Sequence, residues 1–246
     1  MTNSLRIKKL VGLATLTALV VGLQFLSNYV SFGSVSITLA LIPIAMGAIL
    51  YGPFAGAFLG AVMGVIVIVA PSTMGIFMPH NPAATIILCI LKTAVAGLVA
   101  GYVFKLFHYF AKKTNNEKTA KTLFAAGIII STILAPVVNT ALFLLGATVF
   151  FMNVTVKVVD AVTGESMEVL VFGGTFIGII NGVITTNFLI EFAVSTVLAP
   201  SLVTLVKILT SKYSLGFAND FSKFSVFDEE VEGLDSVLEK DIITEA

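Results

Sequence analysis

The sequence has few charged residues, a single cysteine and no tryptophan among its 246 residues. Only 11% of the residues are charged, whereas an ordinary soluble domain carries about 25%. The chain is therefore not a soluble globular domain. The lone Cys89 excludes a disulfide framework and a cysteine-based metal cluster. Without tryptophan, phenylalanine and tyrosine must supply any aromatic belt at the membrane–water interface.

Sequence signatures of an enzyme or of a motor are also missing. No G-x-x-x-x-G-K-[ST] phosphate loop is present, so the chain does not hydrolyse ATP through such a loop. His80 and His108 fall on opposite sides of the predicted membrane region, and no serine and histidine are expected within reach of each other. We expect a protein that is not an enzyme and that holds no metal and no cofactor.

The sequence is rich in apolar segments of helix length, and 57% of its residues are hydrophobic. These segments are too long for the alternating ten-residue strands of a β-barrel. We predict an all-α membrane protein, a bundle of six transmembrane helices. The expected helices cover residues 10–28, 37–51, 54–70, 83–104, 122–151 and 173–198. Pro136 is expected to kink the fifth helix, and Pro200 to end or kink the sixth.

The end of the chain differs in charge from the rest. Residues 213–246 contain nine acidic residues and two lysines, and nine minus two gives a net charge of −7. We therefore divide the chain into a six-helix membrane domain, residues 1–212, and an acidic tail, residues 213–246. A tail of this kind is expected to be solvated and to avoid nucleic acid and anionic lipid.

Three predicted connections carry turn or charge signals. Residues 71–82 are rich in proline and glycine and predict a loop. Residues 105–121 form a basic connection with five lysines. Residues 152–172 show alternation on both sides of Thr163-Gly164, which predicts a small hairpin.

Lysine and arginine are distributed unevenly between the two sides of the predicted bundle. With both termini inside, twelve of the fourteen Lys and Arg residues lie in cytoplasmic segments. Only Lys157 lies outside, and Lys92 lies in the membrane. Because basic residues favour the cytoplasmic side, both termini are expected to be cytoplasmic in a multi-pass protein of the cell membrane.

Small residues recur four positions apart on two predicted helices. Gly56, Gly60 and Gly64 form one stripe, which predicts close packing against a neighbouring helix. Ala14 and Ala18 form a shorter stripe on the first helix. Chance spacing of alanines is the alternative for that pair.

The apolar segment at residues 83–104 has one ionisable residue, Lys92, near its middle. Inserting a lysine at that depth costs about 2.5–3.5 kcal/mol. A carboxylate partner, a watery cavity or a bound anion should offset that cost. We expect a cavity that holds an anionic or strongly polar ligand. The alternative is a structural lysine that is paired or reaches the interface.

Polar residues on three successive predicted helices reach a similar depth in the outer half of the membrane. At about 1.5 Å per residue, Lys92, Asn139 and Asn181 lie about 13, 16 and 12 Å from the outer helix ends. Thr185 lies one turn below Asn181, and Phe143 lies one turn above Asn139. Together they predict a polar floor with an aromatic wall. Hydrogen bonding between helices by the asparagines is the alternative.

Two further polar residues receive separate assignments. Asn81, in the loop before the fourth helix, is included among the candidate substrate-binding residues. Glu191 lies about 27 Å from the outer end of the sixth helix, near the expected cytoplasmic boundary. There it would reach the interface or meet a partner, so we expect it outside the pocket.

Several stretches resemble the substrate-binding S-components of energy-coupling factor (ECF) vitamin transporters. Ala14-Thr-Leu-Thr-Ala18 is similar to the AxxxA motif of that family. Residues 37–64 resemble its second and third helices with their Tyr-Gly-Pro connection, and residues 92–104 resemble its fourth helix. The resemblance covers roughly residues 5–208, whereas the acidic tail and the long fifth loop depart from the compact family pattern.

This resemblance implies a bacterial membrane subunit that captures a vitamin outside the cell. It implies docking through Ala14 and Ala18 onto a transmembrane scaffold subunit, which couples to two ABC-type ATPase subunits. It also implies that the S-component topples in the membrane to deliver its ligand. Ligand contacts are then expected from the outer loops and from helices four, five and six.

The nature of the vitamin follows less directly from the residues. Lys92 favours an anion such as pantothenate, nicotinate, folate, biotin or lipoate. Pantothenate is preferred because its hydroxyls and amide suit Asn139, Asn181 and Thr185. The alternatives are riboflavin or another neutral vitamin, an ion-coupled secondary transporter, and a membrane scaffold that transports nothing.

Overall fold

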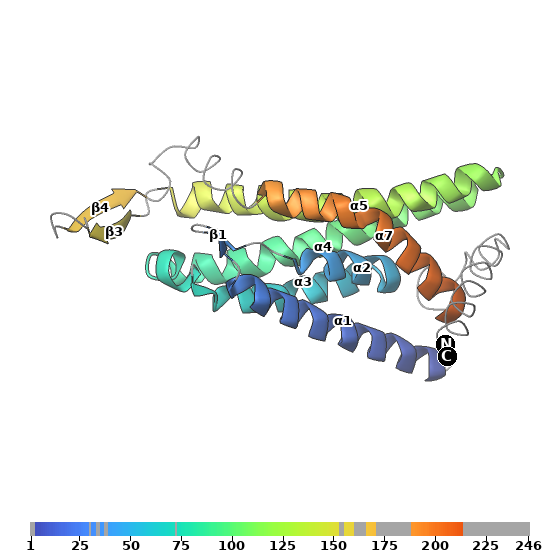
Figure 1. The fold of residues 1–246 in the computed structure, drawn as a ribbon, viewed down its shortest axis with the longest axis horizontal. Coiled ribbons are helices and arrows are strands. Elements are labelled where there is room, and N and C mark those ends of the chain that lie inside the picture. Colours follow the sequence, from blue (N-terminus) through green and yellow to red (C-terminus); the bar gives the residue numbers. More distant parts are fainter. Residues whose placement is uncertain are drawn as a thin grey trace, which may run out of the picture.

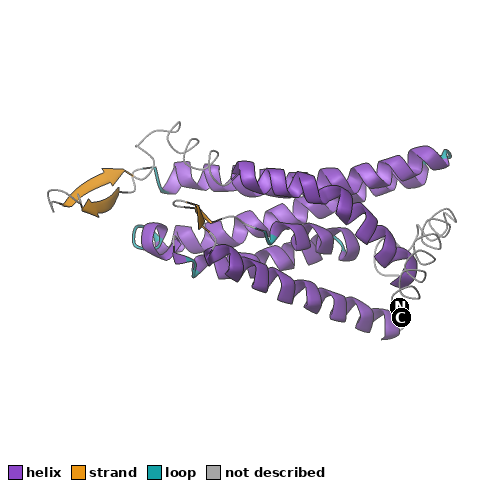
Figure 2. Cartoon of the chain, viewed as in Figure 1, coloured by secondary structure: helices purple, strands orange, loops and turns teal. Residues whose placement is uncertain are grey.

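The computed structural model describes eight stretches of the chain, which are residues 3–29, 31–32, 35–36, 39–71, 73–152, 155–159, 166–170 and 188–213. Helices dominate the described part (Figure 2). They are α1 (Asn3–Tyr29), α2 (Leu41–Tyr51), α3 (Pro53–Ile68), α4 (Pro82–Lys113), α5 (Glu117–Phe150), α7 (Leu189–Tyr213) and the short π-helix η1 (Thr73–Phe77). The strands are β1 (Ser31–Phe32), β2 (Val35–Ser36), β3 (Thr155–Val159) and β4 (Ser166–Leu170).

Four described helices are long and apolar enough to cross a membrane. These candidate spans are Ile7–Ser27, Pro82–Lys113, Glu117–Phe150 and Leu189–Leu209. The chain is therefore a multi-pass membrane protein. The apolar helices α2 and α3 have 11 and 16 residues, so neither reaches the roughly 20 residues that a bilayer core requires. The count of six spans stays a prediction, since much of the expected sixth segment lies outside the described residues.

The long helices run alongside one another, and the start of α1 and the end of α7 lie at the same end of the bundle (Figure 1). The β3–β4 hairpin extends from the opposite end. This arrangement agrees with two termini on one side of the membrane. The cytoplasmic assignment of that side stays a prediction.

The glycine stripe on α3 packs against the backbone of α4, as its spacing predicts. The contacts pair Gly56 with Gly97, Gly60 with Thr93, and Gly64 with Ile90. A Cβ atom added to Gly56 would lie 2.5 Å from the carbonyl oxygen of Gly97. Only glycine permits such an approach, so this prediction is confirmed, and α4 is the neighbouring helix.

Gly52 forms the sharp turn that joins α2 to α3. Its φ of 100° lies in the region that glycine adopts easily. Pro53 then occupies the first turn of α3, where its missing N–H costs nothing. The sequence Tyr51-Gly52-Pro53 therefore ends one apolar helix and starts the next.

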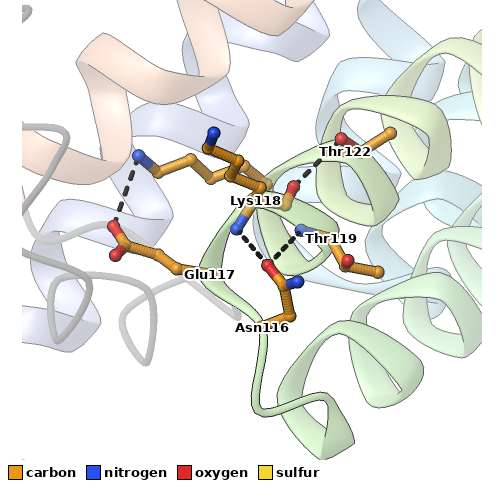
Figure 3. A network of polar contacts seen from close by, with 6 residues as sticks. Asn116, Glu117, Lys118, Thr119 and Thr122 are labelled. Carbon is orange, nitrogen blue, oxygen red and sulfur yellow. Dashed lines mark hydrogen bonds and ion pairs between the residues drawn. The ribbon is translucent and has the colours of Figure 1, made fainter.

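The basic connection expected between the fourth and fifth helices is almost entirely helical. Helix α4 therefore ends later, and α5 begins earlier, than the sequence predicts. Helix α4 continues to Lys113 and α5 already begins at Glu117. Asn116 caps α5 by accepting hydrogen bonds from the backbone N–H groups of Lys118 at 3.0 Å and Thr119 at 3.4 Å (Figure 3). Glu117 forms an ion pair with Lys121 at 3.3 Å. These local interactions favour the early start of α5 in a polar region that hydrophobicity alone assigns to a loop.

Proline does not interrupt the last two long helices. Helix α5 continues through Pro136, and α7 continues through Pro200. The ribbon of α7 changes direction along its length (Figure 1). The expectation that Pro200 ends a helix is therefore wrong, whereas a kink remains compatible with the structure.

The predicted hairpin around Thr163-Gly164 is confirmed by the pairing of β3 with β4. The two strands are antiparallel, with Thr155 opposite Leu170 and Val159 opposite Ser166. A second, two-residue antiparallel pairing joins β1 to β2, between α1 and α2 in the chain. The fold is thus helical apart from two small hairpins in the described residues.

Candidate functional site

Lys92 contacts an aromatic side chain on the neighbouring long helix. Its Nζ atom lies 4.6 Å from the centre of the Phe143 ring on α5. The lysine is half-buried and lies ten positions after Pro82, which is about 15 Å along α4. Within the described residues, no carboxylate oxygen approaches its Nζ within 4.0 Å. The ring face supplies an electrostatic contact, but no counter-charge.

Phe143 belongs to a cluster of aromatic rings at the η1 end of α4 and α5. Its ring meets that of Phe77 edge to face, with centres 5.8 Å apart. Phe77 makes a similar contact with Phe151 at 5.1 Å. Ala84, Leu88 and Ala147 complete the surrounding apolar packing. Phe143 therefore lies in an aromatic cluster, and a role of this cluster as the wall of a ligand pocket stays a prediction.

Phe77 is a component of this wall that the sequence reasoning missed. It lies in the stretch at residues 71–82, which its proline and glycine content assigns to a loop. Within that stretch the structure forms η1 at residues Thr73–Phe77. A large aromatic residue within a short connection was the available signal, because such a side chain seeks an apolar partner.

Asn139 is the most deeply buried of the predicted polar residues that the structure describes. Its side chain is 4% exposed, and its Oδ1 atom has no hydrogen-bond partner among the described residues. An unpaired buried acceptor costs about 1–3 kcal/mol. Hydrogen bonding between helices, the alternative explanation for this residue, is not seen at that oxygen.

Asn81 has a structural role at the start of α4. Its Oδ1 atom accepts a hydrogen bond from the backbone N–H of Ala84 at 3.1 Å. Its backbone carbonyl accepts one from the hydroxyl of Thr85 at 2.8 Å. Pro82 follows as the first helical residue. Substrate binding by Asn81 stays a prediction, but its side-chain oxygen already caps the helix.

Asn181 and Thr185 lie outside the described residues. Their proposed positions beside Lys92 and Asn139 therefore stay predictions. The described part brings together Lys92 and Phe143, with Asn139 one helical turn from Phe143.

Glu191 is buried near the described start of a helix that is longer than expected. It lies in the first turn of α7, is 2% exposed, and belongs to the candidate span Leu189–Leu209. The sequence estimate ended this helix near Leu198, whereas α7 continues to Tyr213. Since more than twenty helical residues follow it, Glu191 does not lie near the end of α7 that adjoins the tail. Its position relative to the cytoplasmic boundary therefore stays a prediction.

Ala14 and Ala18 lie on the outer face of α1, and both are exposed. Gly22 continues the stripe, and a Cβ atom added there would meet nothing within 4 Å. Leu16 and Val20 on the opposite face are buried against α2 and α3. The two alanines are therefore not packed inside the bundle, and a surface of small residues remains open to a partner helix.

The comparisons with known proteins gave one match. A family model described as the substrate-specific component of an ECF transporter matches residues 8–203. The comparisons with curated proteins and with solved structures found no match.

Proposed function

We propose that Lys92 recognises an anionic vitamin within the membrane. The chain belongs to the family of substrate-specific components of ECF transporters. Membership makes the chain a substrate-binding transport subunit that is not by itself an enzyme. Capture of an anionic substrate outside the cell, and its delivery inward with ATP-hydrolysing partners, are the finer parts of the proposal.

The observation that carries this proposal is the cation of Lys92 above the Phe143 ring, without a described carboxylate nearby. Burying a lysine in a membrane costs about 2.5–3.5 kcal/mol. A cation–π contact returns up to about 2 kcal/mol when it is desolvated. The difference leaves a deficit of about 1 kcal/mol, which a bound carboxylate would remove.

Pantothenate is the anion that we favour. Its carboxylate would pair with Lys92, and its hydroxyls and amide would meet Asn139, Asn181 and Thr185. The aromatic cluster of Phe77 and Phe143 would cover the apolar part of the molecule. A neutral vitamin such as riboflavin is the second candidate, with Lys92 donating to a carbonyl or hydroxyl oxygen.

Assembly with partners would use the outer face of α1. Ala14 and Ala18 are exposed, and small residues let two helix backbones approach closely in a membrane. We propose that a transmembrane scaffold subunit docks there and that two ATPase subunits supply the energy. A secondary transporter would need no such partners.

Two measurements on the purified full-length protein test this function. Native mass spectrometry should release a retained small molecule whose mass identifies an anionic vitamin. Co-purification from the source membrane should recover a scaffold subunit and two ATPase subunits. Retention of a neutral vitamin would contradict the anionic substrate, and uptake by the chain alone in liposomes with an ion gradient would contradict the partner-dependent mechanism.

A further inference from the structure

Helices α4 and α5 are longer than a membrane requires. Their 32 and 34 residues correspond to about 48 and 51 Å of helix, whereas the hydrocarbon core of a bilayer is about 30 Å thick. A span of about twenty residues that starts at Pro82 fills such a core near Gly101. Residues 105–121, here called the basic projection, therefore extend beyond the core, at the end of the bundle where α1 begins and α7 ends (Figure 1).

The α4 part of the basic projection carries an exposed apolar stripe that ends in a lysine. Leu106, Tyr109 and Phe110 are 53%, 59% and 49% exposed, and Lys113 is exposed as well. The four residues follow the i, i+3, i+4, i+7 spacing that places side chains on one face of a helix. Outside the hydrocarbon core, lipid tails do not cover such a stripe, so an apolar partner is needed to remove it from water.

The charges of the basic projection favour an acidic partner. Residues 105–121 contain five lysines and one glutamate, and five minus one gives a net charge of +4. The glutamate, Glu117, already pairs with Lys121 at 3.3 Å. Within the described residues, no carboxylate oxygen lies within 4.0 Å of the Nζ atoms of Lys113 and Lys118. A segment that fits the whole projection therefore needs apolar side chains next to acidic ones.

The C-terminal tail of the same chain has this composition. Phenylalanines recur at intervals of four and three residues, which are Phe217, Phe221 and Phe224. They are followed by an acidic block, residues 228–235, in which five of eight residues are acidic and none is basic. Aromatic side chains and acidic side chains thus stand next to each other in the tail, as apolar and basic side chains do on the projection.

The tail begins within reach of the projection. Leu209 of α7 packs against the apolar cluster that contains Ala111 of α4 and Phe124 of α5, and α7 ends four residues later at Tyr213. To reach the apolar stripe, the tail has to pass around α4, which has a diameter of about 10–12 Å. The eight residues from Tyr213 to Phe221 extend up to about 26–29 Å, so the connection is long enough.

We propose that the acidic tail folds back onto the basic projection. The phenylalanines of residues 217–224 cover the apolar stripe of α4, and the acidic block lies beside Lys113 and Lys118. The docked tail keeps the projection away from anionic lipid headgroups and from acidic partner proteins. Because exposed ion pairs contribute little individually and are screened by salt, the contact is exchangeable and its charged part depends on ionic strength.

The absence of tryptophan from the sequence provides an optical test of the apolar half of this contact. Tyr109→Trp places a fluorescent reporter on the stripe of the full-length protein in lipid nanodiscs. Its emission should be blue-shifted and protected from acrylamide, and Phe221→Ser combined with Phe224→Ser should shift it to the red and expose it to the quencher. Phe54→Trp, at a position of α3 that is 77% exposed, is the matched control and should not respond to the tail substitutions.

Carbodiimide, which joins an ammonium to a carboxylate in contact, tests the charged half. In the full-length protein we expect links from Lys113 and Lys118 to the acidic block. These links should occur within single molecules and disappear at 1 M NaCl, where the Debye length is about 3 Å. The Glu117–Lys121 ion pair is the internal positive control, and Lys157 of β3, at the opposite end of the bundle, is the negative control.

Several results would overturn the proposal. Emission of Tyr109→Trp that stays blue-shifted with both tail substitutions would show that lipid covers the stripe. Links from the acidic block to Lys8 or Lys9 would move the docking surface to α1, and links only between molecules would make the contact one between two copies. A Glu117–Lys121 link without any link to the acidic block would leave the tail undocked.

Vitamin affinity separates this proposal from the proposed function. Lys92 lies twenty-one residues before Lys113 on α4, which corresponds to about 32 Å along the helix. The tail substitutions should therefore leave vitamin affinity unchanged. Weaker vitamin binding in Phe221→Ser combined with Phe224→Ser would place the tail at the substrate site and overturn its assignment to the basic projection.

Discussion

Replacing Lys92 by methionine removes its charge but keeps most of the length of its side chain. The change leaves the aromatic cluster of Phe77 and Phe143 in contact with an apolar chain. Alanine would also remove the packing of the stem, so methionine isolates the ammonium more cleanly. Lys113→Met, at the exposed end of the same helix, provides the matched control.

The expected effects on affinity and stability have opposite signs. Loss of a hydrogen bond to a charged group costs about 1.5–3 kcal/mol of binding free energy, which corresponds to roughly ten- to 150-fold weaker binding. In the ligand-free protein, the insertion cost of about 2.5–3.5 kcal/mol disappears, and a cation–π contact of up to about 2 kcal/mol is lost with it. The free energy of unfolding without ligand should therefore rise by about 1 kcal/mol.

Titration calorimetry with the vitamin identified by mass spectrometry measures the first effect, and thermal melting without ligand measures the second. Lys92→Arg should restore binding only in part, because a planar guanidinium does not replace a compact ammonium. Equal affinities in wild type and Lys92→Met would refute the role of the cation in recognition. A lower melting temperature with unchanged affinity would identify Lys92 as a structural residue.

Three further predictions follow from the packing and from the tail. Gly60→Ala should lower the free energy of unfolding by about 1–3 kcal/mol, because its Cβ would lie 2.6 Å from the carbonyl carbon of Thr93. The control variant Gly22→Ala, with open space around it, should melt no lower than wild type. Equal melting temperatures of the two variants would contradict the close α3–α4 contact. Ala14→Leu combined with Ala18→Leu should leave ligand affinity and melting near normal but abolish uptake and scaffold co-purification, so transport at the wild-type rate would refute docking at this face. Deletion of residues 220–246 should leave vitamin binding intact, and loss of binding by the purified truncation would show that the acidic tail contributes to the site.

Regular spacing and turn chemistry made part of the fold predictable from the sequence. The Gly56, Gly60 and Gly64 stripe identified close helix packing, since its four-residue period places all three on one face. Thr163-Gly164 between alternating segments identified the β3–β4 hairpin. In both cases the signal lies within a short stretch of sequence. The hairpin strand pairs with the next strand along the chain, and the glycine stripe can pack against any helix that presents its backbone.

Helix lengths and depths were less predictable because they depend on polar capping and on neighbours. The Asn116 cap extends α5 into a basic region that hydropathy excludes. The depth of Glu191 depends on which part of α5 packs against α7, and that register is a tertiary property. Depth alone placed Lys92 and Phe143 at similar levels, and the two side chains are in contact. It could not reveal Phe77, which lies on a separate short helix, and the binding role of these residues stays a prediction.

The residues proposed for binding and those proposed for docking occupy different parts of this bundle, so the two functions should be separable. Leu16 and Val20 hold α1 against α2 and α3, so Ala14 and Ala18 face outward. Lys92 and Phe143 belong to α4 and α5, which meet through the aromatic cluster. Helix α3 lies between these two regions and packs against α4, with the backbones in close contact at Gly56 and Gly97. Bulk added to the outer face of α1 should therefore meet none of the described residues of the proposed site, whereas bulk added inside the α3–α4 contact should shift the helix that carries Lys92.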